Sequence, residues 1–227
     1  MIITALLTGR GNNTFKNKNV KKIYGKPILY YPCSEAKKVK SIKNFLVSSE
    51  DKKILSAASK YGYEKILRPK NLSKPNSQHY DVLIHALKKI NNKPDILVVL
   101  LANAPIIKKK WIEDCINILK KKKEITSVVP VLQDNDHHPL RAKKVNKGYL
   151  KSFFKNNNSS SNRQALEKSF YLCHNFWVIR TEEIIKNEGE KPWSFMGKKT
   201  KAYIIKNSID IHSKEDLAIS KILMKIE

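Results

Sequence analysis

The sequence lacks the features of several large classes of protein. No apolar stretch approaches the length of a membrane-spanning helix, and no cationic region precedes the short apolar run that starts at Ile2, so we expect neither a membrane segment nor a secretory signal. The three cysteines, Cys33, Cys115 and Cys173, lie too far apart for the usual spacing of metal ligands. An odd number of isolated cysteines is typical of reduced thiols, so we expect a cytoplasmic protein.

Acidic residues and arginine are also scarce, although the formal net charge is +25. Such a surplus is typical of proteins that bind nucleic acid. Here the cations are mostly lysines spread from end to end, and no stretch interleaves aromatic and basic residues as single-strand binders do. We attribute the charge to a compositional bias toward Lys, Asn and Ile and expect no nucleic-acid partner. The charge would still attract an anionic substrate.

Apolar runs and helical periodicity alternate along the 227 residues, which are enough for one sizeable core. Strands are predicted at 2–7, 45–49, 64–67, 95–101, 125–131, 149–154, 170–179, 200–205 and 208–211. Helices are predicted from Pro27 to about Val39, from Glu50-Asp51 to about Gly62, and over 81–90, 109–122 and 214–225, the last capped by Ser213. This alternation predicts a doubly wound, mostly parallel α/β sheet.

Two segments interrupt or punctuate that pattern. Residues 134–179 look like an insertion with its own antiparallel strands, and residues 155–162 inside it form an Asn/Ser-rich loop. The first predicted strand runs into a loop at 8–19 that holds two glycines, several small amides and three cations, Arg10, Lys16 and Lys18. Glycines and cations suit a polyphosphate, because backbone N–H groups can approach its oxygens. The loop is neither a Walker A motif nor a G-x-G-x-x-G fingerprint, and an ordinary Asn/Lys-rich surface turn remains the alternative.

Seven short segments together give a more specific signal. They are LLTGRGNNTFKNKNV near the start, GKPILYY (25–31), ILRPKNLS (66–73), LLANAP (100–105), HHPLR (137–141), NRQAL (162–166) and SIDIHSKEDL (208–217). In this order and spacing the chain resembles the acylneuraminate cytidylyltransferase family, which comprises the CMP-sialic acid and other CMP-nonulosonic acid synthetases. The resemblance covers nearly the full chain. It implies a nucleotide-diphospho-sugar transferase-like fold, with one nucleotidyltransferase domain over 1–227 and a dimerisation insertion at about 134–179.

The resemblance also implies a reaction and a nucleotide site. Such enzymes transfer CMP from CTP to a 2-keto-3-deoxy sugar acid and release pyrophosphate, with a divalent metal, Mg²⁺ or Mn²⁺, neutralising charge. Matching positions assign catalysis to Lys18 and Asp210, and Arg10, which lies one position later than the family's loop arginine, is expected to take that arginine's role. The residues expected to bind the nucleotide are Thr8, Gly9, Arg10, Gly11, Asn12, Lys18, Asn19, Arg68 and Asn103.

The expected sugar-acid site and metal site come from the same resemblance. The residues expected to bind the sugar acid are His138, Arg141, Arg163, Gln164 and Asn175. Asp210 is expected to bind the metal, with Asn103 and His212 as further candidates. The insertion implies a homodimer in which each subunit completes the sugar site of the other.

Two departures from the family pattern keep alternatives open. Asn13 occupies the place of a loop lysine, and His212 occupies the place of a second metal-binding aspartate. One alternative is therefore a catalytically impaired homologue that binds a ligand. Another is a different sugar nucleotidyltransferase, such as a relative of the 3-deoxy-manno-octulosonate cytidylyltransferases. The Arg-Pro segment at Arg68 and the insertion favour a nonulosonic acid, although the sequence does not name which one.

Overall fold

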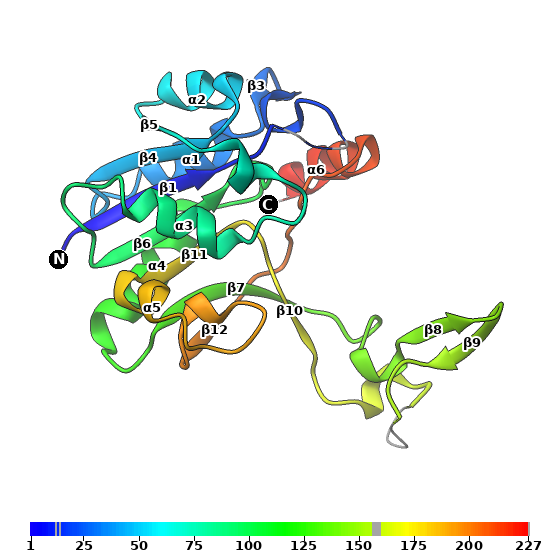
Figure 1. Ribbon diagram of the computed structural model, residues 1–227. Coiled ribbons are helices and arrows are strands. Elements are labelled where there is room, and N and C mark those ends of the chain that lie inside the picture. Colours follow the sequence, from blue (N-terminus) through cyan, green and yellow to red (C-terminus); the bar gives the residue numbers. More distant parts are fainter. Residues whose placement is uncertain (12, 14, 156–159, 227) are drawn as a thin grey trace.

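The computed structural model describes residues 1–11, 13, 15–155 and 160–226. Figure 1 shows a layered body built on a twisted sheet, and an arm that extends away from it. The strands of the central sheet are β1 (Ile3–Thr8), β4 (Asn44–Ser49), β5 (Glu64–Leu67), β6 (Ile96–Leu101), β7 (Ser127–Gln133), β10 (Phe170–Leu172), β11 (Phe176–Arg180) and β12 (Thr200–Ile204). The helices are α1 (Tyr30–Lys37), α2 (Lys52–Ser59), α3 (His79–Leu87), α4 (Lys109–Lys121), α5 (Thr181–Lys186) and α6 (Lys214–Ile226).

The sheet has the order β10-β7-β11-β6-β1-β4-β5, and β12 pairs with β7. Strands β5, β4, β1 and β6 run parallel, whereas β11 runs antiparallel to both β6 and β7. The loops that follow β1 and β6 therefore leave the same edge of the sheet, which is where parallel α/β sheets bind ligands.

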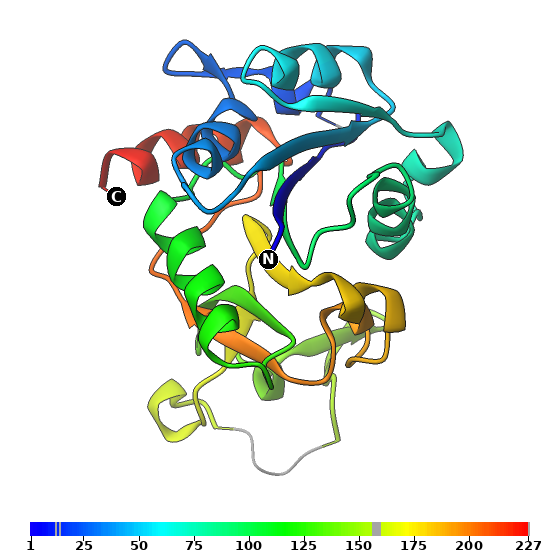
Figure 2. The ribbon, with the colours of Figure 1, turned by 90° about the vertical axis from the view of Figure 1, so that its left-hand side faces the viewer.

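Alternate residues of each central strand pack against opposite helical layers. On β6, Val98 and Leu100 belong to the core beneath α1, α2 and α4, whereas Leu97 and Val99 belong to the core beneath α3 and α5. Figure 2 shows α1 and α4 on one side of the sheet and α3 and α5 on the other. Burial on both faces accounts for the unbroken apolar runs of β1 and β6. The predicted doubly wound, mostly parallel α/β fold is confirmed.

Two local predictions are wrong. Pro27 does not begin a helix, because it lies in β3 (Lys26–Pro27), which pairs with β2 (Lys22–Ile23) in a small hairpin. Tyr24 and Gly25 have positive φ angles of 46° and 77° and form the turn of that hairpin, so α1 begins later, at Tyr30. Residues 208–211, all of which are described, form an extended loop without strand pairing.

The predicted insertion is only partly separate from the sheet. Its first part forms the arm, which carries the hairpin of β8 (Lys143–Asn146) and β9 (Tyr149–Ser152). Its last part, β10 and β11, returns into the central sheet, and Phe176 and Trp177 are buried there. Within the described ranges, no helix combines the length and apolarity needed to cross a bilayer.

Candidate functional site

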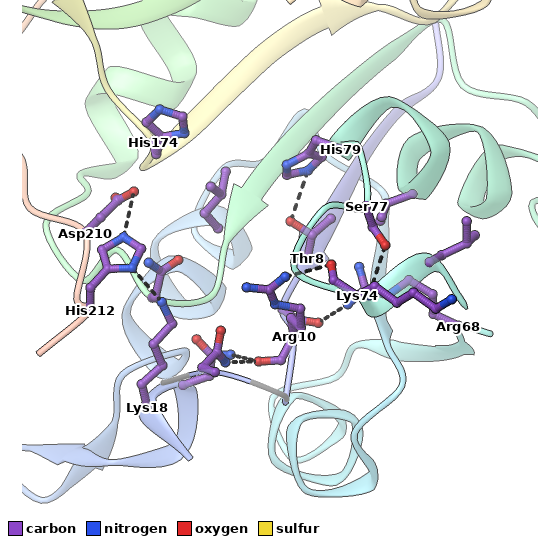
Figure 3. A pocket seen from close by; sticks show the side chains of 17 residues that line it. Thr8, Arg10, Lys18, Arg68, Lys74, Ser77, His79, His174, Asp210 and His212 are labelled. Carbon is purple, nitrogen blue, oxygen red and sulfur yellow. Dashed lines mark hydrogen bonds and ion pairs between the residues drawn. The ribbon is translucent and has the colours of Figure 1, made fainter. Parts of the chain in front are cut away.

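A cavity of about 540 Å³ opens at the carboxyl ends of β1 and β6 (Figure 3). It is lined by Thr8, Gly9, Arg10, Asn13, Lys18, Asn19, Arg68, Leu72, Lys74, Ser77, His79, Val82, Leu101, Asn103, His174, Asp210 and His212. Among these residues only Asp210 carries a carboxylate, whereas Arg10, Lys18, Arg68 and Lys74 are cationic. The excess of positive charge makes the cavity suitable for an anionic ligand.

The loop after β1 begins between the ends of two neighbouring strands. The Gly9 N–H donates to the Ser48 carbonyl of β4 at 3.3 Å, and the Ala102 N–H donates to the Thr8 carbonyl at 3.0 Å. A Cβ atom at Gly9 would lie 3.0 Å from the Cβ of Ala102, which is closer than side-chain carbons normally pack. A glycine here therefore lets the loop pass directly over the end of β6.

Amide side chains of the same loop hold it in place. The Arg10 carbonyl accepts a hydrogen bond from Asn19 Nδ2 at 2.9 Å and another from Asn13 Nδ2. The Arg10 guanidinium donates to the Lys74 carbonyl at 2.8 Å on the far side of the cavity. Asn13, which replaces the family's lysine, thus supports the backbone of the loop. Asn12 lies outside the described residues, so its predicted role is untouched.

Lys18, His212 and Asp210 point toward one another on one side of the cavity (Figure 3). Lys18 Nζ donates to His212 Nδ1 at 3.2 Å, and His212 Nε2 lies 3.9 Å from Asp210 Oδ2. His212 is held in turn by the start of α6, because its N–H and that of Ser213 both donate to the Asp216 carboxylate, at 2.8 and 2.9 Å. The Asp216 N–H donates back to Ser213 Oγ at 3.0 Å, which confirms the predicted capping pair.

The Asp210 carboxyl group lies in an unusual environment. Its Oδ1 is enclosed and has no hydrogen-bond partner among the described residues. Burial raises the pKa of Asp210 to about 7, against the opposing charge of Lys18, and burial likewise lowers the pKa of Lys18. An enclosed carboxylate oxygen without a partner favours a bound cation.

A metal held here would depend mainly on that one carboxylate. In the part of the chain that the structure describes, no three His, Cys, Asp or Glu side chains are grouped to hold a metal ion. Asn103 also lines the cavity, and its carbonyl accepts from the Ile211 N–H at 3.0 Å, which ties the Asp210 segment to the end of β6. The residues fit a hard divalent ion if a bound triphosphate and water complete its oxygen ligands.

Arg68 reaches the cavity as part of a buried ion pair. Its Nη2 donates to the Gly9 carbonyl at 2.5 Å and to Glu50 Oε2 at 3.0 Å. Glu50 follows β4, and its sequence pattern indicated only an acid at a helix start. Asp51 is the residue that caps α2, through a hydrogen bond from the Lys53 N–H at 2.7 Å.

Two histidines of the cavity were also missed. His79 lies at the start of α3 with its ring centroid 5.0 Å from that of Trp177, and its Nε2 is 3.4 Å from Thr8 Oγ1. Burial, reinforced by the charges of Arg68 and His174, lowers the pKa of His79 to about 3. His174 also packs against Trp177, with 5.6 Å between the ring centroids. Neither histidine belongs to a motif, so only the folded chain brings them together.

Within one chain, the residues expected to bind the sugar acid lie elsewhere. Arg141 and Arg163 belong to the arm, where Arg163 Nη1 donates to Asp136 Oδ2 at 2.6 Å. His138 is buried in the arm and accepts from the Leu140 N–H, and Gln164 lies beside Arg163. Asn175, just before β11, is fully buried, and its Nδ2 donates to the Ile106 carbonyl at 2.9 Å.

Comparisons with known proteins agree with this geometry. Residues 10–187 match the family model described as cytidylyltransferase. The chain is 23% identical to the pseudaminic acid cytidylyltransferase of Campylobacter jejuni subsp. jejuni serotype O:23/36 (strain 81-176), over 95% of this chain and 93% of that protein. It is 24% identical to a Helicobacter pylori (strain ATCC 700392 / 26695) protein named pseudaminic acid cytidylyltransferase and UDP-2,4-diacetamido-2,4,6-trideoxy-beta-L-altropyranose hydrolase. That match covers 69% of this chain and spans about a third, 31%, of the relative.

The fold has close structural counterparts. The structure of CMP:2-keto-3-deoxy-manno-octonic acid synthetase complexed with CTP aligns with a TM-score of 0.73 and covers 99% of both chains, at 14% identity. At that identity the likeness shows a shared fold. The family model covers well over half of the chain and includes most of the cavity's loop and wall. The resemblance found in the sequence is confirmed, and the chain belongs to the cytidylyltransferase family.

Proposed function

We propose that this protein transfers CMP from CTP to the anomeric hydroxyl of a nonulosonic acid and releases pyrophosphate. The observation that carries the proposal is the cavity at the carboxyl ends of β1 and β6, where Arg10 and Lys18 face the single carboxylate Asp210. The family membership and the full-length similarity to a pseudaminic acid cytidylyltransferase support it. CTP and a sialic acid-like sugar acid are thus the substrates.

The residues of the cavity perform the reaction mainly by positioning and charge. Thr8 and Gly9 begin the loop that lies along the triphosphate, Gly11 anchors the backbone of that loop to Glu50, and Arg10 and Lys18 neutralise the triphosphate oxygens. Neutralisation of the charge on the phosphate oxygens lets the sugar's hydroxyl oxygen attack the α-phosphorus. The new O–P bond forms as the bond from the α-phosphorus to the bridging oxygen breaks, the hydroxyl proton passes to solvent, and pyrophosphate leaves. Because Lys18 is 6% exposed, its ammonium group acts at close range with little screening by water.

A divalent cation would complete this charge balance. Asp210 would hold Mg²⁺ or Mn²⁺ through its enclosed Oδ1, and Asn103 lies nearby. His212 is hydrogen-bonded to Lys18. The ion would supply positive charge to the triphosphate oxygens. His212 Nδ1 accepts from Lys18 Nζ, so in this arrangement His212 orients the lysine.

The sugar-acid site requires a second subunit in this proposal. The arm carries exposed apolar side chains, Val145, Tyr149, Leu150, Phe153 and Phe154, each 48–73% exposed in the single chain. Burial of such a patch against another copy removes apolar area from water. In a two-fold dimer the arm's His138, Arg141, Arg163 and Gln164 would approach the partner's cavity and bind the carboxylate and hydroxyl groups of the sugar acid.

Two alternatives make different predictions. The replacements at Asn13 and His212 favour a catalytically impaired homologue that still binds CTP, because each removes a charged group from the cavity. A 3-deoxy-manno-octulosonate cytidylyltransferase activity would use the same fold. The structural likeness at 14% identity supports that fold without choosing the sugar.

The test is an incubation of the purified protein with CTP, Mg²⁺ and a panel of 2-keto-3-deoxy sugar acids, followed by measurement of pyrophosphate. We expect release that depends on a nonulosonic acid. Release with 3-deoxy-manno-octulosonate alone would favour the second alternative. CTP binding without release for any sugar acid would favour the impaired homologue.

Nucleotide choice provides an independent check on the same cavity. A pocket can distinguish cytosine from the other bases through the exocyclic amine, which donates to backbone carbonyls. We expect CTP to raise the melting temperature more than ATP, GTP or UTP, measured by differential scanning fluorimetry. Equal shifts for all four nucleotides would contradict a site that distinguishes bases.

A further inference from the structure

We infer that Glu50 is a positioning residue of the nucleotide site: together with Arg68 it fixes the peptide groups on both sides of Arg10. The inference rests on the proposed function, since it concerns how the loop is held for a triphosphate. Glu50 follows β4 and does not line the cavity, so any effect it has on the ligand must pass through the loop.

The hydrogen bonds form a closed bracket. Glu50 Oε1 accepts from the Gly11 N–H at 2.8 Å, and Glu50 Oε2 accepts from Arg68 Nη2 at 3.0 Å. The same Arg68 nitrogen donates to the Gly9 carbonyl at 2.5 Å. One carboxylate–guanidinium pair therefore holds the residue before Arg10 and the residue after it.

The pair is shielded from solvent, which strengthens the bracket. The side chains of Arg68 and Glu50 are 4% and 13% exposed. Burial by itself would raise the pKa of Glu50, but hydrogen bonds from Arg68 and from backbone N–H groups, that of Gly11 included, hold it below its ordinary value. The carboxylate is thus charged at neutral pH, and charge-assisted hydrogen bonds of this kind are stronger than neutral ones.

Close packing leaves the loop little freedom on this side. A Cβ atom at Gly11 would lie 2.5 Å from Asp51 Oδ2, a distance that no side chain tolerates. A glycine at this position therefore lets the loop approach the junction of β4 and α2 closely enough for Glu50 to reach its N–H group. The Arg10 side chain leaves this fixed backbone and extends across the cavity to the Lys74 carbonyl.

The cations of the cavity therefore have different roles. Arg68 is neutralised by Glu50 and donates its hydrogen bonds to the loop and to that carboxylate, whereas Arg10 and Lys18 have no carboxylate within ion-pair distance among the described residues. Removal of the Glu50 charge would free Arg68 and release Gly11. Arg10 would then lose its fixed position, and CTP would bind more weakly without any change in the residues that contact it.

The experiment compares Glu50→Gln with a control that destabilises the body without touching the loop. Val47→Ala serves this purpose, because Val47 is buried in β4 on the sheet face that packs against α1, α2 and α4. The equilibrium dissociation constant for CTP is measured by calorimetry at a temperature where both variants are folded, and KM and kcat are measured with the sugar acid. We expect Glu50→Gln to weaken CTP binding at least about tenfold, which corresponds to 1.4 kcal/mol, and Val47→Ala to leave it within about twofold.

A second variant keeps the inference testable if Glu50→Gln does not fold. Glu50→Asp keeps the charge but is one methylene shorter, so it retains an ion pair with Arg68 and loses the reach to Gly11. Its affinity should lie between those of the wild type and Glu50→Gln. Wild-type affinity in Glu50→Asp, or equal weakening by Glu50→Gln and Val47→Ala, would overturn the inference. If the wild type itself fails to bind CTP, the proposed function fails instead.

Discussion

The body and the arm of this protein differ in how completely each buries its apolar side chains and pairs its charges. All six residues of β6 are buried, whereas every residue of β8 and β9 is exposed. The loop at the end of β1 is held by buried charges and backbone hydrogen bonds, while the arm places several large apolar side chains in water. The body thus forms its cavity from its own contacts, whereas the arm leaves apolar area in water, which is the area that the proposed dimer would bury.

The ion pairs of the two regions support the same conclusion. Arg68–Glu50 in the body is nearly enclosed, so it fixes geometry. Arg163–Asp136 in the arm has side chains about 60% exposed, and exposed pairs contribute only about 0–1 kcal/mol. The exposed pair therefore adds little to the fixing of Arg163, whereas Arg141 donates to the Asn135 and Asp136 carbonyls. The second subunit proposed above would cover the exposed part of the arm.

The largest expected effect concerns the metal in the body. Asp210→Asn should lose Mg²⁺-dependent turnover, because a neutral amide holds a divalent cation far less well than a carboxylate. Pyrophosphate release over a Mg²⁺ titration measures it. Asp81→Asn, at an exposed position of α3, is the control and should retain wild-type turnover.

A substitution at His212 should strengthen metal binding, the opposite of the effect of Asp210→Asn. His212→Asp should place a second carboxylate beside Asp210 and lower the Mg²⁺ concentration needed for half-maximal rate. An unchanged Mg²⁺ requirement in this variant, together with an active Asp210→Asn, would show that the metal binds somewhere else.

Lys18 offers the next largest effect. Lys18→Ala removes a buried ammonium group from the triphosphate side of the cavity, so activity should fall by orders of magnitude with little change in melting temperature. Lys16→Ala removes an exposed lysine two residues earlier and should behave as the wild type. Near-normal turnover of Lys18→Ala would contradict the assigned role of the loop.

A substitution in the arm should change the oligomeric state and the KM for the sugar acid. Leu150→Glu places a charge in the exposed apolar patch, so we expect light scattering to show a monomer where the wild type is a dimer. KM for the sugar acid should rise, while the affinity for CTP stays the same because the body is intact. Lys151→Glu, on the opposite side of β9, is the control for the added charge. A monomeric wild type at micromolar concentration would refute the dimer.

The smallest expected effect is a pH dependence of stability in the body. His79 has a pKa of about 3 in the folded state, against about 6.5 when unfolded, because burial disfavours its charge. Below pH 6.5 the unfolded chain binds a proton that the folded chain rejects, so stability falls by about 1.4 kcal/mol per pH unit as the pH drops from 6.5 toward 3. His79→Gln should remove this contribution.

Thermal unfolding between pH 7 and pH 5 measures the effect. The wild-type melting temperature should decline more steeply than that of His79→Gln, by roughly 3–5 °C per pH unit below 6.5. The exposed His137→Gln serves as the control and should follow the wild type. Parallel curves for wild type and His79→Gln would show that the His79 environment is not as enclosed as the structure indicates.

The body was largely predictable from the sequence, for a physical reason. Strands β1 and β6 are buried on both faces, so their apolar runs are continuous and end within a residue or so of the predicted limits. The loop of 8–19 and the segment 102–105 follow two neighbouring parallel strands, and the Ala102 N–H donates to the Thr8 carbonyl there.

The remaining features depend on contacts between distant residues. Glu50 turns toward Gly11 and Arg68, which lie 39 and 18 positions away, and no local pattern records that choice. His79 reaches the cavity only because Trp177 of β11 packs beside it. The predicted insertion at 134–179 included β10 and β11, which belong to the central sheet. Their apolar sequences would suit an interface strand equally well, so the sequence pattern did not separate them from the arm.

Label transfer from CTP tests the central claim most directly. CTP labelled with ³²P at the α-phosphate, and separately at the γ-phosphate, is incubated with the protein, Mg²⁺ and a nonulosonic acid. Transfer of CMP predicts that the α label enters a sugar-dependent product and that the γ label appears only in pyrophosphate. An α label that stays in CTP for every sugar acid, or a γ label found on the sugar, would contradict the proposed reaction.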